Sequence, residues 1–167
     1  MLRQMLVAVD FSVWGRYAAG HACDVAQAIG GTVTLLHVLE PHESGTLDSE
    51  VAHTLLQELS LLARRPPSCL IVPVSAGFTG HHPEADSLSG GVDDGIAPAI
   101  LAVADRLDAE LIVIGLHGQG NPTARTLGRV AQQVLSGARV PVQVVPCPSD
   151  RSLVNRWAAA LAELANR

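Results

Sequence analysis

The stretch that decides the fold is LIVIGLHGQG at residues 111–120, followed by GRVAQQVLSGARVPVQVV at residues 128–145. It opens with four apolar residues, turns at three glycines, resumes as a helical pattern near Gly128 and closes on a second strand-like run. A buried strand that leads into a glycine turn and a helix start is suited to binding an anion. Glycines let the backbone approach the anion closely, and the helix start offers N–H groups that have no partner within the helix.

The rest of the chain repeats this alternation of strand and helix. Short apolar runs predict strands at 5–9, 32–39, 69–74, 111–114 and 140–145. Helical spacing predicts helices between Ser12 and Gly30 and at 48–63, 96–107 and 127–136. The alternation predicts an α/β fold of the Rossmann-like type, in which a five-stranded parallel sheet has the strand order 3-2-1-4-5 and helices on both faces.

Polar residues and glycines mark where the predicted helices begin and end. Ser12 can cap the first helix, and Gly30 can stop it. Asp48 or Ser49 can cap the second helix, and Gly137 can stop the fourth. The apolar stripe of the second helix, which is expected to face the sheet, comprises Val51, Leu55, Leu59 and Leu62.

The chain is expected to form one domain over residues 1–148, followed by an amphipathic C-terminal helix over residues 149–167. Its 167 residues are enough to bury a core, and hydrophobic and aromatic contents of 48% and 3% require that core to be aliphatic. Residues 75–95 are rich in Gly, Ser, Asp and His and have no apolar period. They are expected to form a long, flexible loop.

Composition and charge exclude several classes of protein. The formal net charge is −5, which argues against nucleic-acid binding, and all eleven basic residues are Arg, which excludes P-loop NTPases because these need a lysine. Three widely spaced cysteines form no CxxC pair and are expected to be free thiols in a reducing compartment. No apolar run reaches membrane length and no leader precedes the first strand, so a cytoplasmic protein without a membrane partner is expected.

Two features converge at one edge of the predicted sheet. Open parallel sheets bind ligands at the carboxyl ends of their strands, where the strand order reverses, here between the first and fourth strands. Asp10 follows the first strand, and the turn from Gly115 follows the fourth. A carboxylate can accept hydrogen bonds from ribose hydroxyls, while the turn and the helix start can hold phosphates. The combination predicts a nucleotide ligand.

The glycines of this region also have a characteristic spacing. Two residues separate Gly115 from Gly118, and nine separate Gly118 from Gly128. This pattern resembles the nucleotide motif of universal stress proteins, and the chain is similar to a UspA-like domain over nearly the whole of 5–146. Three short segments, at 7–12, 36–38 and 140–142, add to the resemblance. The family motif continues with Ser or Thr, whereas this chain has Arg129.

The resemblance implies a role for each matching residue. Asp10 would lie at the ribose, and the backbone of Val38 would contact adenine. The glycine turn would line the ribose and the phosphates, and Gly128 would present its N–H to a phosphate. The predicted binding set comprises Asp10, Phe11, Val38, Gly115, His117, Gly118, Gly128, Arg129 and Val130.

Arg129 leaves two outcomes open at the phosphate end of this site. A guanidinium can pair bidentately with a phosphate, more strongly than a hydroxyl can. Yet a cation at a helix N-terminus opposes the helix dipole by about 0.3–1 kcal/mol, so without an anion the side chain would swing away. Arg129 therefore either binds the phosphate or degrades the motif.

The resemblance implies a regulatory module of the stress response that binds ATP, AMP or another adenine nucleotide, with or without Mg²⁺. It also implies a homodimer formed through strand 140–145, which is expected at the sheet edge and open to pairing. One alternative is an interaction module that binds no nucleotide. A second is a slow ATP hydrolase or an adenylating enzyme.

The histidines do not point to catalysis. His37 lies within a strand and is expected to be a core histidine satisfied by a hydrogen bond, and His117 is expected to contact a ligand or solvent. His81 and His82 have no spaced partner on a regular element, so no metal site is predicted. No nucleophile–base pair or catalytic carboxylate pair is recognisable, which favours a binding module over an enzyme.

Overall fold

The computed structural model describes residues 3–39, 46–61, 63–74, 95–118 and 127–146. Most of the predicted loop 75–95 and the whole of the predicted helix 149–167 lie outside the described residues. The elements are β1 (Gln4–Ala8), α1 (Val13–Ile29), β2 (Thr32–Leu39), α2 (Thr46–Leu61), β3 (Ser68–Pro73), α3 (Ile96–Arg106), β4 (Leu111–Gly115), α4 (Arg129–Gly137) and β5 (Val142–Val145).

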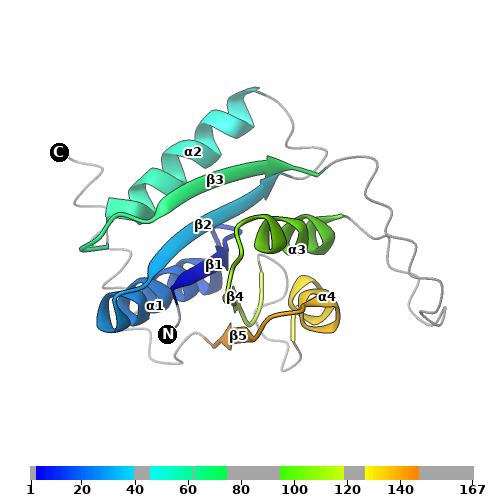
Figure 1. Cartoon of the computed structure of the whole chain (residues 1–167). Helices are drawn as coiled ribbons and strands as arrows, with labels where there is room; N and C mark the ends of the chain where they lie inside the picture. The colour runs from blue at the N-terminus through cyan, green and yellow to red at the C-terminus, as the bar shows by residue number, and fades with distance from the viewer. Residues whose placement is uncertain (1–2, 40–45, 62, 75–94, 119–126, 147–167) are drawn as a thin grey trace.

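The five strands form one sheet in the order β3-β2-β1-β4-β5, and every neighbouring pair is parallel (Figure 1). The predicted fold class is therefore confirmed. β1 lies in the middle, and its residues Met5, Leu6 and Val7 are fully buried. An apolar run without alternation suits this position, because helices cover both faces of a parallel sheet.

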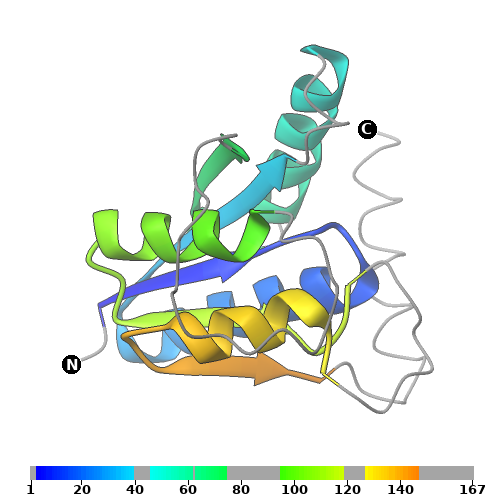
Figure 2. The same ribbon diagram turned by 90° about the vertical axis from the view of Figure 1, so that its right-hand side faces the viewer.

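Two aliphatic layers hold the helices against the sheet. On one face, Val7, Leu35 and Val113 pack with α1 and α2. On the other, Leu6, Leu36 and Ile112 pack with α3 and α4, and Figure 2 shows these two helices together on one side of the strands. Successive residues of a strand point to opposite faces, so the same three strands supply both layers.

Both ends of α1 agree with their prediction. The Ser12 hydroxyl accepts a hydrogen bond from the Gly15 N–H at 3.1 Å, which caps the helix start. Gly30 ends the helix in the left-handed conformation, with φ of 72°, where a glycine carries no steric penalty.

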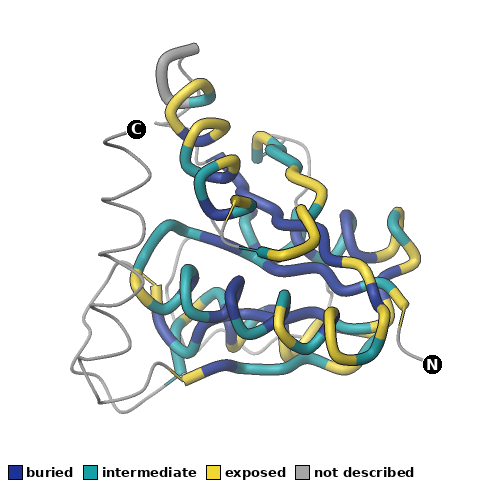
Figure 3. The backbone as a smooth tube through the Cα atoms, turned by 90° about the vertical axis from the view of Figure 1, so that its left-hand side faces the viewer, coloured by how far each residue is buried: buried dark blue, intermediate teal, exposed yellow. Residues whose placement is uncertain are grey.

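The predicted apolar stripe of α2 is correct at Leu59 but wrong at Val51. The helix begins at Thr46, so Asp48 and Ser49 lie within its first turn and not at its N-cap position. Its inward residues are Ala52, Leu56 and Leu59, while Val51 is 56% exposed. Figure 3 shows that buried and exposed residues alternate along this helix. The predicted stripe and the observed one both satisfy helical spacing, and packing on the sheet selects the one that contains Leu56. Leu62 lies outside the described residues.

Smaller differences occur at three other elements. β3 starts one residue before its predicted position, and β5 starts two residues after. α4 begins at Arg129 and includes Gly137, and its C-cap is Ala138 in an extended conformation. A Cβ on Gly137 would lie 2.7 Å from Leu101, so this glycine lets α4 approach α3 and does not stop the helix. Within the described chain, α-helices are too short or too polar to cross a bilayer.

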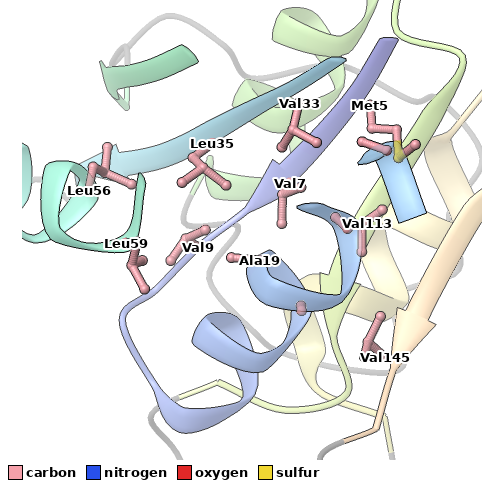
Figure 4. Close-up of a cluster of buried hydrophobic side chains, with 13 residues drawn as sticks. Met5, Val7, Val9, Ala19, Val33, Leu35, Leu56, Leu59, Val113 and Val145 are labelled. Atoms are coloured by element: carbon pink, nitrogen blue, oxygen red, sulfur yellow. The ribbon is translucent and has the colours of Figure 1, made fainter. Parts of the chain in front are cut away.

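The layer that packs against α1 and α2 is shown in Figure 4. Met5, Val7 and Val9 of the first strand region meet Leu56 and Leu59 of α2 in one continuous cluster. In the first strand region, the buried residues of this cluster end at Val9, one residue before Asp10. The packed core thus fixes the point at which the first polar residue emerges from the sheet.

Candidate functional site

The candidate site lies at the carboxyl edge of the sheet, between β1 and β4. Ala8 of β1 pairs with Ile114 of β4. Asp10 and the turn 115–118 therefore leave the sheet side by side. β1 connects to β2 on one side and pairs with β4 on the other, so the strand order reverses at this crevice, as predicted.

The Asp10 carboxylate organises the turn from β1 into α1. Its Oδ1 accepts hydrogen bonds from the Ser12 N–H at 3.1 Å and from the Ser12 hydroxyl at 2.6 Å. The same hydroxyl caps α1 through Gly15. Asp10 and Ser12 thus form a capping network at the start of α1. A ligand role stays a prediction.

Glycines surround this carboxylate because no side chain fits there. A Cβ on Gly118 would lie 2.7 Å from Asp10 Oδ2, and a Cβ on Gly15 would lie 2.6 Å from Oδ1. Real Cβ atoms essentially never approach another heavy atom this closely, so a larger residue would push the carboxylate aside. The structure thus brings Asp10 and Gly118 into contact, across more than a hundred residues of sequence.

The glycine turn is bonded to the neighbouring elements on two sides. The Leu116 N–H donates to Val145 at the end of β5, at 3.0 Å. The Gly128 N–H donates to the Leu116 carbonyl, at 2.9 Å. The family resemblance assigned the Gly128 N–H to a phosphate, and in this structure Leu116 accepts it. Gly128 is the N-cap of α4 and has an extended conformation, with φ of −61° and ψ of 149°.

The start of α4 is the positive element of the site. N–H groups in the first turn of a helix have no acceptor within the helix, and the helix dipole makes this end attractive to anions. The first turn contains no acidic residue. Arg129 is exposed at its first position, and Val130 follows it. Both predicted residues therefore lie at the N-terminus of α4, as the sequence pattern required.

His117 is buried against α1, with only 9% of its surface exposed. Its ring meets the ring of Trp14 edge to face, with centroids 4.9 Å apart and an interplanar angle of 80°. A solvent-facing His117, one of the two expected positions, is therefore excluded. Its predicted ligand contact is not tested by this geometry.

The β2 end of the site contains His37, Phe11 and Val38. His37 is buried, and its Nδ1 donates to the Val9 carbonyl at 2.7 Å, which confirms the expected core histidine. Phe11 has a φ of 59°, a conformation that costs a non-glycine residue about 1–2 kcal/mol. Its ring packs 4.4 Å from His37 and its carbonyl accepts a hydrogen bond from Arg16. These contacts offset the strain. The Val38 side chain is buried in the core, so only its backbone can reach a ligand.

Two residues of this region were missed in the sequence. Gly15 could have been identified from the sequence. A glycine in a helix costs about 1 kcal/mol relative to alanine, so its presence in the first turn of α1 indicates that another group lies close to its backbone. Trp14 had no comparable signal, since a large aromatic residue beside a helix cap has no fixed partner in sequence. The described residues contain no cluster of three potential metal ligands, and His81 and His82 lie outside them.

A parallel sheet in this order, with a carboxylate, a glycine turn and a helix start at its switch point, defines an open, doubly wound α/β domain, the class of fold in which ligands bind at the switch point. A model of the universal stress protein family matches residues 1–146. The chain belongs to the universal stress protein family.

Relatives and solved structures agree with this assignment. The chain is 32% identical over 141 residues to universal stress protein Rv2005c of Mycobacterium tuberculosis, covering 84% of this chain and 44% of that protein. It is 29% identical over 146 residues to universal stress protein Mb2019 of Mycobacterium bovis, covering 87% of this chain and 44% of the relative. The chain thus spans less than half the length of these relatives.

Three solved universal stress protein structures share the fold. One from Archaeoglobus fulgidus has a TM-score of 0.62 at 23% identity, covering 86% of this chain and 98% of that one. A universal stress protein in complex with cAMP has a TM-score of 0.59 at 19% identity, with coverage of 88% and 98%. An A. fulgidus protein in complex with dAMP has a TM-score of 0.57 at 20% identity, with coverage of 86% and 97%.

Proposed function

We propose that this chain is a regulatory module of the stress response that binds an adenine nucleotide at the crevice between β1 and β4. The observation that carries the proposal is the contact between Asp10 and Gly118 beside the N-terminus of α4. A group that accepts hydrogen bonds from hydroxyls and an element that attracts anions lie at one switch point, which suits a ribose and its phosphate. Fold neighbours in complex with cAMP and dAMP support the adenine preference.

In this proposal each element of the site contacts one part of the nucleotide. Asp10 accepts hydrogen bonds from the ribose, and the backbone at Val38 contacts adenine. The turn from Gly115 to Gly118, with Phe11 and His117 beside it, encloses the ribose. The α4 start, with Gly128, Arg129 and Val130, receives the phosphates. The ligand is ATP, AMP or a related nucleotide, with Mg²⁺ where the phosphate chain is long, and the cytoplasm supplies all of these.

Isothermal calorimetry with ATP–Mg²⁺, AMP and cAMP on protein freed of bound nucleotide tests this proposal. We expect micromolar binding of at least one adenine nucleotide, and loss of binding in Asp10→Ala. Chromatography of the denatured protein as purified should then release that nucleotide. Absence of heat with all three ligands, in protein that melts cooperatively, would contradict the proposal.

Arg129 decides between this function and a module that binds no nucleotide. Engagement of the Gly128 N–H by Leu116 favours the second function, because it removes one donor that the family motif offers to phosphate. If Arg129 contacts phosphate, Arg129→Ser should weaken ATP binding more than AMP binding. If Arg129 obstructs the site, the same substitution should strengthen both.

We also propose that two copies pair through β5. β5 is the edge strand of the sheet, with one neighbour. The described chain shows no helix or strand on its outer side, so its outward backbone groups are open to pairing (Figure 1). The same dimer would serve the nucleotide-free alternative, in which the module acts through its contacts with other proteins.

A further inference from the structure

We propose that Trp14 is a positioning residue, which fixes the glycine turn of the site through the ring of His117. The inference rests on the proposed function, because the turn matters for a ligand only if the crevice between β1 and β4 binds one. Trp14 belongs to the first turn of α1, the same turn whose cap Ser12 is bonded to Asp10. One helix start therefore contacts both halves of the crevice.

Trp14 contacts the turn at two points. A Cβ on Gly115 would lie 2.9 Å from the Trp14 carbonyl carbon and 3.0 Å from its Cβ, so the end of β4 rests directly on the Trp14 backbone. Two residues later, the Trp14 side chain meets the His117 ring at 4.9 Å in an edge-to-face arrangement. Perpendicular rings at this separation attract each other through their quadrupoles, so the contact has a preferred geometry.

Packing, not hydrogen bonding, sets the position of His117. His37, the other buried histidine of the site, is fixed by the Val9 carbonyl at 2.7 Å. Among the described residues, no such bond is found for the His117 ring, which is only 9% exposed. The contact with Trp14 is therefore the feature that determines where this ring lies.

His117 transmits its position to the two ligand-facing elements. The following residue, Gly118, lies so close to Asp10 that a Cβ would be 2.7 Å from its carboxylate. On the other side, a Cβ on Gly128 would be 3.4 Å from the Cα of His117. A shift of the His117 backbone must therefore change the distance from the turn to Asp10, to the α4 start, or to both.

The first test needs no ligand. In ¹⁵N-labelled protein, Trp14→Leu should move the amide resonances of Gly115 and Gly118, and Trp14→Phe should largely restore them because it keeps an aromatic ring against His117. Val13→Ala is the matched control, since Val13 is the adjacent residue and is 47% exposed. If the Gly118 amide is the same in wild type and Trp14→Leu, the proposal is overturned.

The second test measures nucleotide affinity in a double-mutant cycle. Trp14→Leu should weaken binding by about three- to tenfold, the effect expected from losing one aromatic pair. In a His117→Leu background the same substitution should have almost no further effect, because Trp14 acts through His117. Equal losses in both backgrounds would overturn the proposal. If wild type binds no adenine nucleotide, the proposed function fails, and the amide resonances alone decide whether Trp14 positions the turn.

Discussion

Oδ2 of Asp10 lies 2.7 Å from the point that a Cβ on Gly118 would occupy. Asp10 follows the first strand, and Gly118 follows the fourth, yet the carboxylate fills the space that any larger residue at 118 would need. The oxygen Oδ1 of the same carboxylate is bonded to Ser12. The carboxylate thus cannot move without disturbing the start of α1, so both partners of the contact are constrained.

Gly118→Ala should therefore disturb the site more than its added volume suggests. Although Gly118 is exposed, an added methyl group must displace the Asp10 carboxylate, and overpacking of this kind destabilises a protein by about 1–3 kcal/mol. We expect a loss of that size by urea denaturation, together with weaker nucleotide binding. In an Asp10→Ala background the stability cost of Gly118→Ala should largely disappear. If Gly118→Ala were equally destabilising in the Asp10→Ala background, the added methyl group would clash with a residue other than Asp10.

Ser12→Ala should destabilise the fold by about 1 kcal/mol, the usual cost of removing a helix cap. The substitution removes the hydroxyl that accepts from Gly15 and donates to Asp10. Ser12→Thr keeps that hydroxyl and should retain most of the stability. Urea denaturation of the three proteins checks this. Equal midpoints for wild type and Ser12→Ala would show that the cap does not contribute.

Leucine-to-alanine substitutions in α2 test which side of the helix faces the sheet. Leu56 is fully buried and Leu61 is 67% exposed in the same helix. Leu56→Ala should cost about 2–5 kcal/mol, because it opens a cavity in the core. Leu61→Ala should change stability by less than about 0.5 kcal/mol, as exposed positions usually do. Similar costs for both would contradict the burial seen here.

Cys23 should make stability depend on alkaline pH. Burial raises the pKa of its thiol to about 11, and the nearby Asp24 and Cys69 add to the shift. A thiol whose pKa rises on folding contributes its full stability below its ordinary pKa of 9.0, and this contribution is lost as the pH rises through about 11. The free energy of unfolding should therefore fall across this range.

The control for this pH dependence is Cys23→Ala, in which the decrease between pH 9.0 and about 11 should be smaller than in wild type. Burial also raises the pKa of the Cys69 thiol, so part of the decrease should remain. Denaturation curves at several pH values measure both slopes. If stability fell equally steeply with pH in wild type and Cys23→Ala, groups other than Cys23 would cause the pH dependence.

Val144→Pro tests pairing through β5. The carbonyls of Pro141 and Val145 accept hydrogen bonds from backbone N–H groups at the two ends of β4. Because alternate residues of a parallel strand bond to the same neighbour, the backbone groups of Val142 and Val144 point away from β4. Proline at 144 removes an outward N–H and leaves the bonds to β4 intact. We expect light scattering to show a monomer with an unchanged circular dichroism spectrum. A dimer that survives would place the interface on another surface.

Periodicity and turn chemistry were sufficient to predict the strands and the cap of α1, because each depends on residues close in sequence. The sheet order followed from the rules for chains that alternate strand and helix, not from local pattern. The register of α2 was not predictable in this way. Val51 and Ala52 fit helical spacing equally well, and only contact with the sheet distinguishes them. Sequence separation thus limits what pattern alone can resolve.

At the candidate site, too, some features could be predicted from the sequence and others could not. The spacing of Gly115, Gly118 and Gly128 predicted where the turn and the α4 start would meet. It could not show that the Gly128 N–H would be taken by Leu116, since that bond depends on the local path of the turn. Nor could it place Trp14 against His117, a contact between residues from different elements of the fold.

The position of β1 between β2 and β4 also determines when the crevice comes into existence as the chain is synthesised. β1, β2 and β3 can pair while the second half is still on the ribosome, and Asp10 is then at an uncovered strand edge. Gly118 emerges more than a hundred residues later, a delay of about 5–20 seconds at ordinary rates of translation. Asp10 and Gly118 therefore cannot meet until β4 has inserted beside β1, so a nascent chain lacks the proposed site until that step.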